Sequence, residues 1–173
     1  MNRTLLVLLV SCLSLTTKAQ DDPVENLKKL GITLPKPTAP IANYKPWNRT
    51  GNLIYLSGAG PTTPDGTTIK GKLGQDLDVK AGYDAARAVG IQLLAILQDA
   101  CGGDLRKVKR VVKALGMVNS TPDFTQQPAV INGFSDLMVA VFGEKGKHAR
   151  SAFGVAAIPL GACVQIEMVA ELA

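Results

Sequence analysis

Residues 148–157 read His-Ala-Arg-Ser-Ala-Phe-Gly-Val-Ala-Ala, so that a single arginine, Arg150, opens a run that is otherwise almost wholly apolar. An apolar run of this length after the polar loop 143–147 predicts a largely buried strand that begins near Arg150. A guanidinium held there suits a small carboxylate, because its planar fork makes two parallel charge-assisted hydrogen bonds. A structural ion pair is the alternative role, and the pattern by itself favours the ion pair.

The composition is that of one globular domain. The chain has 173 residues, of which 46% are hydrophobic and 19% charged, and this is enough to bury a sizeable core. No segment repeats at a fixed period. The net charge of +5 is too small to indicate nucleic-acid binding by itself.

Histidine and cysteine are scarce. With one histidine and three cysteines the chain offers almost no ligands for zinc or a transition metal, so we expect no metal and no cofactor. Cys101 and Cys163 lie far from the N-terminus. An oxidising compartment permits a disulfide between them, but in a core of this size we expect two buried free thiols.

The first nineteen residues differ in character from those that follow. A short positive head, an apolar run over residues 4–15 and small residues up to Ala19 predict a secretory signal peptide that is too short to span a membrane. The alternative is a lipoprotein box ending at Cys12, which would anchor a lipidated Cys12 at a membrane. We therefore expect export to the periplasm or the exterior. The predicted organisation is a signal peptide over 1–19, an N-terminal extension over 20–39 and one domain over 40–173.

Hydrophobic periodicity and turn residues divide the chain into short elements. Asp22 and Pro23 begin a short helix that Gly31 ends, and Asp78 caps the clearest helix of the chain. A Gly-Asn pair at 51–52 predicts a hairpin turn, and a long polar loop follows over 62–76. The predicted main elements are strands 44–48 and 53–57, helix 79–100, strand 108–118, a second helix that residues 121–123 open and that runs over 129–142, and strands 151–157 and 164–172.

This order, β-β-α-β-α-β-β, predicts an α+β fold in which a single sheet carries two helices on one face. The other face must also be covered, because a large apolar surface is seldom left in water. The apolar residues of the last two strands indicate that another subunit covers it. These residues are Phe153, Val155, Val164, Ile166 and Met168.

Several short pieces, taken together, resemble the Rid/YjgF family. They are Tyr44, the strand Gly-Asn-Leu-Ile-Tyr-Leu-Ser-Gly at 51–58, Asn132, Ala149-Arg150-Ser151 and Ile158-Pro159. This family is also known as the endoribonuclease L-PSP family and has a chorismate-mutase-like fold. The resemblance extends from about residue 40 to the C-terminus. The 62–76 loop and the stretch Pro-Asp-Phe-Thr-Gln-Gln-Pro at 122–128 indicate a divergent branch.

The resemblance implies a homotrimer with clefts between its subunits. In the enzymes of the family, such a cleft hydrolyses 2-imino or enamine acids to a 2-oxo acid and ammonia. Arg150 matches the arginine that binds the substrate carboxylate. Four other residues match cleft-lining positions: Tyr44, Ser57, Gly58 and Asn132. The expected partners are a small 2-imino or 2-oxo acid and further copies of the chain, without metal or cofactor.

Two positions depart from the pattern of the family's enzymes. Where they place a glutamate that holds the attacking water, this chain has Gln165, which can orient water but cannot accept its proton at neutral pH. Glu167 matches a second glutamate of the family, and Ala152 replaces a frequent cysteine. We therefore expect either a deaminase in which Gln165 positions the water, or a trimer that binds small carboxylates without catalysis.

Two other activities are less favoured. Ribonuclease activity is claimed for some relatives, but no aromatic residues that could stack bases interrupt the basic run 106–113, so we expect a solvated strand face and no nucleic-acid partner. A serine hydrolase could combine Ser57 with His148, the only histidine. No Gly-x-Ser-x-Gly elbow surrounds Ser57, and a lone loop histidine is usually solvated.

Overall fold

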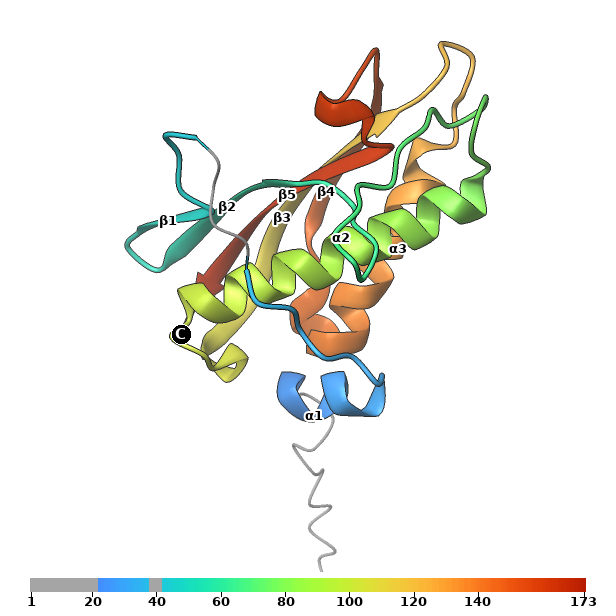
Figure 1. The fold of residues 1–173 in the computed structure, drawn as a ribbon. Helices are drawn as coiled ribbons and strands as arrows, with labels where there is room; N and C mark the ends of the chain where they lie inside the picture. Colours follow the sequence, from blue (N-terminus) through green and yellow to red (C-terminus); the bar gives the residue numbers. More distant parts are fainter. Residues whose placement is uncertain (1–21, 38–41) are drawn as a thin grey trace, which may run out of the picture.

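The computed structural model describes residues 22–37 and 42–173 and contains a mixed five-stranded sheet with helices on one face (Figure 1). The sheet order is β1-β2-β5-β3-β4, in which β3 and β4 run parallel and the other neighbours are antiparallel. The predicted α+β fold is confirmed. The strands are β1 (Trp47–Thr50), β2 (Leu53–Ala59), β3 (Val108–Asn119), β4 (Ala149–Val155) and β5 (Val164–Leu172).

Two long helices, α2 (Val79–Ala100) and α3 (Gln127–Phe142), pack against each other over the same face of the sheet (Figure 1). Asp78 caps α2 as predicted, because its carboxylate accepts a hydrogen bond of 2.7 Å from the amide of Ala81. At the contact between the two helices stands Gly133, where an added Cβ would overlap the carbonyl oxygen of Tyr83. The two helix backbones therefore approach each other closely at this glycine.

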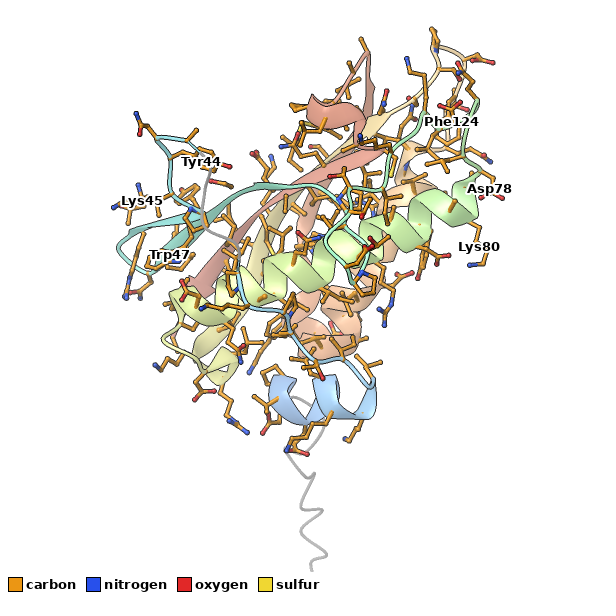
Figure 2. The ribbon with its side chains drawn as sticks, viewed as in Figure 1. Tyr44, Lys45, Trp47, Asp78, Lys80 and Phe124 are labelled. Atoms are coloured by element: carbon orange, nitrogen blue, oxygen red, sulfur yellow. The ribbon has the colours of Figure 1, made fainter. Side chains whose placement is uncertain are left out.

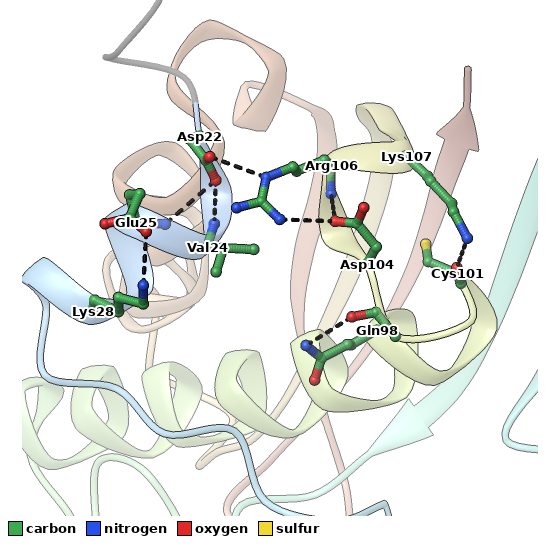
Figure 3. A network of polar contacts seen from close by, with 10 residues as sticks. Asp22, Val24, Glu25, Lys28, Gln98, Cys101, Asp104, Arg106 and Lys107 are labelled. Atoms are coloured by element: carbon green, nitrogen blue, oxygen red, sulfur yellow. Dashed lines mark hydrogen bonds and ion pairs between the residues drawn. The ribbon is translucent and has the colours of Figure 1, made fainter.

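The short helix α1 (Pro23–Lys29) packs against the end of α3 (Figure 1). Asp22 caps it as predicted by accepting a hydrogen bond from the amide of Val24 at 2.9 Å. The same carboxylate accepts a hydrogen bond of 3.0 Å from the Nε of Arg106, which also pairs with Asp104 (Figure 3). Asn26 donates to the carbonyl of Val141 in α3 at 3.0 Å. These contacts dock the N-terminal segment on the sheet-and-helix body.

Three of the predicted main elements begin at residues other than those predicted. β1 begins three residues late, at Trp47, because the preceding Pro46 has no N–H with which to extend the ladder. β4 lies two residues early, from Ala149 to Val155, because that is the segment in parallel register with β3. α3 begins two residues early, at Gln127, and Pro128 lies in its first turn, where a missing N–H costs no hydrogen bond.

The open face of the sheet, away from α2 and α3, differs in composition from the prediction. Alternation along β5 turns its even-numbered residues toward the helices, so three of the five residues predicted for the open face are instead buried in the core: Val164, Ile166 and Met168. Phe153 stays 43% exposed and lies on the open face in register with Met117. The main apolar residues of that face are Tyr55, Leu115, Met117, Phe153 and Val169.

The 62–76 loop is hydrogen-bonded to the end of the sheet, although its sequence is mostly polar. Leu73 is fully buried, its amide donates to the carbonyl of Asn119 at 2.8 Å, and its carbonyl accepts from the amide of Thr121 at 3.0 Å. Residues 121–123, predicted to open the second helix, instead belong to an irregular turn over 121–126 beside this loop. Leu73 thus ties the long loop to the end of β3, and the Nδ2 of Asn119, which donates to the carbonyl of Gly71 at 3.2 Å, adds a second tie.

The predicted signal peptide over 1–19, with the lipoprotein alternative at Cys12, lies outside the described residues. Within the part of the chain that the structure describes, no helix has both the length and the apolar character needed to cross a bilayer. Cys101 and Cys163 are free and buried, as predicted, and burial raises the pKa of both thiols.

Candidate functional site

Arg150 lies at the beginning of the edge strand β4, and its side chain reaches toward α3. Its Nη1 donates two hydrogen bonds of 2.9 Å, one to the Oδ1 of Asn132 and one to the Oγ of Ser135. Both hydrogens of Nη1 are therefore used. Within residues 22–37 and 42–173, no hydrogen bond or ion pair engages the Nε or Nη2 of Arg150. The guanidinium is held at one nitrogen and leaves a two-donor edge for an anion.

His148 stands next to this arginine. Its Nδ1 lies 2.7 Å from the carbonyl oxygen of Gly146, and its Nε2 lies 3.2 Å from the Oγ of Ser135. The ring also packs edge-on against Phe134, with centroids 5.4 Å apart. Burial lowers the pKa of His148 below the ordinary histidine value, the bond to Gly146 opposes this, and the charge of Arg150 lowers the pKa further.

Gly58 and Gln165 meet on neighbouring strands. A Cβ added to Gly58 would lie 2.6 Å from the Nε2 of Gln165, so the glycine makes room for that carboxamide. Ser57 donates from its hydroxyl to the carbonyl of Lys45 at 2.7 Å, which ties β2 to the segment before β1. Tyr44 is 55% exposed, and Figure 2 shows it on that segment, at the opposite end of the molecule from the start of α2.

The predicted site residues therefore fall into separate groups in one chain. Arg150 and Asn132 are brought together on the helix side of the sheet, at its β4 edge. Gln165 projects from the opposite face, because the neighbouring even-numbered residues of β5 point toward the helices. Ser57 and Gly58 lie with Gln165 rather than with Arg150. A single copy cannot bring Arg150 and Gln165 to the same small ligand.

A hollow of about 600 Å³ opens on the open face of the sheet. Its lining includes the polar residues Lys45, Ser57, Lys113 and Glu167, together with Tyr55 and Leu115. Ser57 is the one predicted site residue that lines it. The hollow therefore belongs to the open face of the sheet and is separate from the surroundings of Arg150.

Three basic residues of the run 106–113 pair with nearby acids. Lys109 and Arg110 both pair with Glu171 on β5, at 2.8 and 2.7 Å, and they hold the pKa of that carboxyl below its usual value. Arg106 pairs with Asp22 and Asp104. Such surface pairing agrees with the predicted solvated strand face.

The fold and these positions can be compared with known proteins. Residues 25–172 match the family described as "YjgF/chorismate_mutase-like, putative endoribonuclease". This chain belongs to that family. Over 148 residues it is 47% identical to Protein TCP17 of Trypanosoma cruzi, a match that covers 85% of this chain and 92% of the relative. It is also 30% identical to Protein HMF1 of Saccharomyces cerevisiae, over 76% of this chain and 86% of that protein.

Two solved structures differ in how closely they resemble this chain. Atu1372 from Agrobacterium tumefaciens, described as of unknown function, is 41% identical with a TM-score of 0.80, and the match covers 87% of this chain and 94% of that one. RidA from an Antarctic Psychrobacter is 27% identical with a TM-score of only 0.55, although 82% of this chain and 98% of that one are covered. The backbone thus follows the first protein more closely, as expected for a divergent branch.

The sequence did not reveal the role of Ser135. Ser135 lies in the middle of a helix with no motif around it, and only the packing of α3 against β4 brings it to Arg150 and His148. The spacing of Asn132 and Ser135, one helical turn apart, was the available signal, because i and i+3 positions share one face of a helix.

Gly58 offers a direct test of this part of the site. We expect Gly58→Ala to displace the Gln165 carboxamide, because the new Cβ would lie 2.6 Å from its Nε2. The fold should persist, since the obstructing atom is the end of a flexible side chain. Ligand binding that depends on Gln165 should weaken by roughly tenfold while the Tm changes by only a few degrees. Unchanged binding would place Gln165 outside the site.

Proposed function

We propose that this protein hydrolyses small 2-imino or enamine acids to 2-oxo acids and ammonia, with Arg150 as the carboxylate anchor. The supporting observation is the guanidinium of Arg150, which two hydrogen bonds fix at Nη1 while its Nε–Nη2 edge stays open. Membership of the YjgF-like family, one of whose solved relatives is named RidA, agrees with this activity.

Hydrolysis of a 2-imino acid depends more on the positions of the substrate and the water than on strong activation of either. A 2-imino acid is a small planar anion, and two parallel hydrogen bonds from one guanidinium edge fix both its place and its plane. Its C2 atom is already electrophilic, so a water molecule held above the plane can attack it. Asn132 and Ser135 keep the guanidinium from rotating, and Gln165 is proposed to orient the water from a neighbouring copy.

The proposed site lies between copies of the chain, in a homotrimer. Arg150 and Gln165 project from opposite faces of the sheet, so one copy cannot supply both to one ligand. The open face exposes apolar residues such as Phe153 that a second copy would cover. Members of this family usually form oligomers of one chain. Sedimentation of the purified protein as a single trimeric species would support this arrangement, and a monomer would contradict it.

The decisive experiment measures ammonia and 2-oxo acid release by the purified protein. An amino-acid oxidase in excess generates 2-imino acids in situ, and the rate is compared with spontaneous hydrolysis. We expect acceleration by the protein. An absence of acceleration, together with measurable binding of pyruvate, would instead support the alternative function of a trimer that binds small carboxylates, which the presence of Gln165 favours.

Gln165→Glu tests how far this residue limits the rate. We expect kcat for imine hydrolysis to rise about tenfold or more, because a carboxylate accepts a proton from water and a carboxamide does not. Gln165→Leu is the matched control and should lower kcat, since leucine neither orients water nor accepts a proton. Equal rates in all three proteins would remove position 165 from the mechanism.

A further inference from the structure

Ser135 and His148 form a hydrogen-bonded pair whose direction follows from the chemistry of its neighbours. The carbonyl of Gly146 only accepts hydrogen bonds, so the Nδ1 that lies 2.7 Å from it carries a hydrogen. In the neutral ring, Nε2 is then an acceptor, and Ser135 donates its hydroxyl hydrogen to it across 3.2 Å. Arg150 in turn donates to the Oγ of Ser135. The result is an ordered chain from Arg150 through Ser135 to His148.

This arrangement has the parts of an activated hydroxyl. A histidine accepts from the serine through one nitrogen, and a fixed carbonyl orients the ring through the other nitrogen, as a carboxylate does in many hydrolases. Ser135, His148 and Arg150 are all partly exposed, so small molecules can reach them. The pair adjoins the proposed carboxylate anchor and comes from the same copy of the chain.

We propose that Ser135 and His148 accept the proton of the attacking water, the task that Gln165 cannot perform. This inference rests on the proposed imine hydrolysis and adds two residues to its mechanism. Ser135 touches the water and is the catalytic residue of the pair. His148 acts through Ser135 and is a positioning and proton-storing residue.

The proton balance of the step is complete. The reacting form is the 2-imino acid protonated on nitrogen, an iminium whose carboxylate Arg150 binds. The oxygen of water bonds to its C2, one proton of the water passes to Ser135 as the hydroxyl proton of Ser135 passes to His148, and the C=N π pair moves to nitrogen. His148 returns the proton through Ser135 to the amino group. The C–N bond then breaks with its electron pair on nitrogen, and the hydroxyl proton goes to the released ammonia. The products are a 2-oxo acid and ammonium, and no other reactant is needed.

The surroundings of His148 keep its ring neutral and able to accept. α3 presents the uncharged Ser135 and Phe134 to it, and the turn before β4 presents the carbonyl of Gly146. Three charged residues near the pair in the sequence have other partners. Glu144 pairs with Lys147 at 2.6 Å, and Asp136 accepts a hydrogen bond from the hydroxyl of Tyr83 at 2.9 Å. Arg150 is the charged group that acts on the ring, and both burial and its charge lower the pKa of His148.

The first test uses the fact that the chain has a single histidine. In a tag-free protein, nitrogen-15 NMR of the ring reports its tautomer and its titration without any ambiguity of assignment. We expect the Nδ1–H tautomer, titration below the ordinary value of about 6.5, and a shifted titration when pyruvate is added. A ring with Nε2–H, or a titration that pyruvate leaves unchanged, would overturn the proposal.

The second test is kinetic. His148→Gln should lower kcat for imine hydrolysis by roughly 10²-fold with little change in KM. Ser135→Ala should lower kcat by a similar factor and also raise KM, because it removes one of the two hydrogen bonds that hold Arg150. Ser135→Thr, which keeps a hydroxyl, should recover most of the rate. Activity of the wild type should fall as the pH drops through the pKa of His148, because a protonated ring cannot accept, and His148→Gln should abolish this dependence. Lys147→Gln, beside the histidine, is the matched control and should leave kcat unchanged.

Different results would overturn imine hydrolysis itself and the role of Ser135 and His148 in it. A wild-type protein without imine hydrolysis would remove the proposed function and this inference with it. A wild-type protein that hydrolyses imines through Arg150, while His148→Gln retains both kcat and the acidic fall of the pH profile, would remove this inference alone. Recovery of His148→Gln by an added Gln165→Glu would support it, because the new carboxylate would replace the lost acceptor.

Discussion

Replacing Arg150 by alanine is expected to lower kcat/KM for imine hydrolysis by roughly 10²–10³-fold and to weaken pyruvate binding in proportion. The physical reason is that the Nε–Nη2 edge is an open pair of charged donors beside Ser135, so its loss removes both the charge partner of the carboxylate and the plane that orients C2. Initial-rate kinetics and calorimetric titration with pyruvate measure the two effects separately.

Arg150→Lys should recover little of the activity. An ammonium is a point charge without the planar fork, and it cannot bind Asn132, Ser135 and a carboxylate in the same geometry. Arg110→Ala is a matched control, since Arg110 is an arginine of the neighbouring strand β3 that pairs with Glu171 on the surface. Full activity in Arg150→Ala, or an equal loss in Arg110→Ala, would contradict the anchoring role.

Gly133→Ala should strongly destabilise the fold. An added Cβ would overlap the carbonyl oxygen of Tyr83 and lie 2.8 Å from its carbon, and these backbone atoms of α2 cannot turn aside as a side chain does. The helices must separate, which we expect to cost about 3 kcal/mol after the gain in helix propensity. That cost corresponds to a fall in Tm of roughly 6–12 °C by thermal unfolding.

Gly90→Ala, in the middle of α2, is the control for this prediction. Its added Cβ would meet the Cδ2 of Leu137 at 2.9 Å and the Cδ2 of Phe134 at 3.3 Å, both of them side-chain atoms. Their adjustment offsets the gain in helix propensity, so the free energy of unfolding should change by less than about 1 kcal/mol. Equal destabilisation by the two substitutions would show that α2 and α3 do not approach at Gly133 as described.

The sequence by itself determined the elements whose residues act locally. Asp78 and the hydrophobic periodicity after it predicted α2 from Val79 to Ala100, and periodicity and turn residues predicted β5 from Val164 to Leu172. Capping and periodicity depend on residues a few positions apart, so one sequence is enough to predict them. The order of these elements also gave the α+β fold.

Tertiary structure decided what depends on contacts between distant residues. The ends of β4 are set by its parallel register with β3. Met168 is buried because α2 and α3 cover the face of the sheet on which it lies. The place of Arg150 with Asn132, and its separation from Gln165, likewise depend on which strand each residue joins. The neighbourhood of Ser135 and His148 arises only when α3 packs beside β4, because no local pattern in the chain links a mid-helix serine to a histidine thirteen positions later.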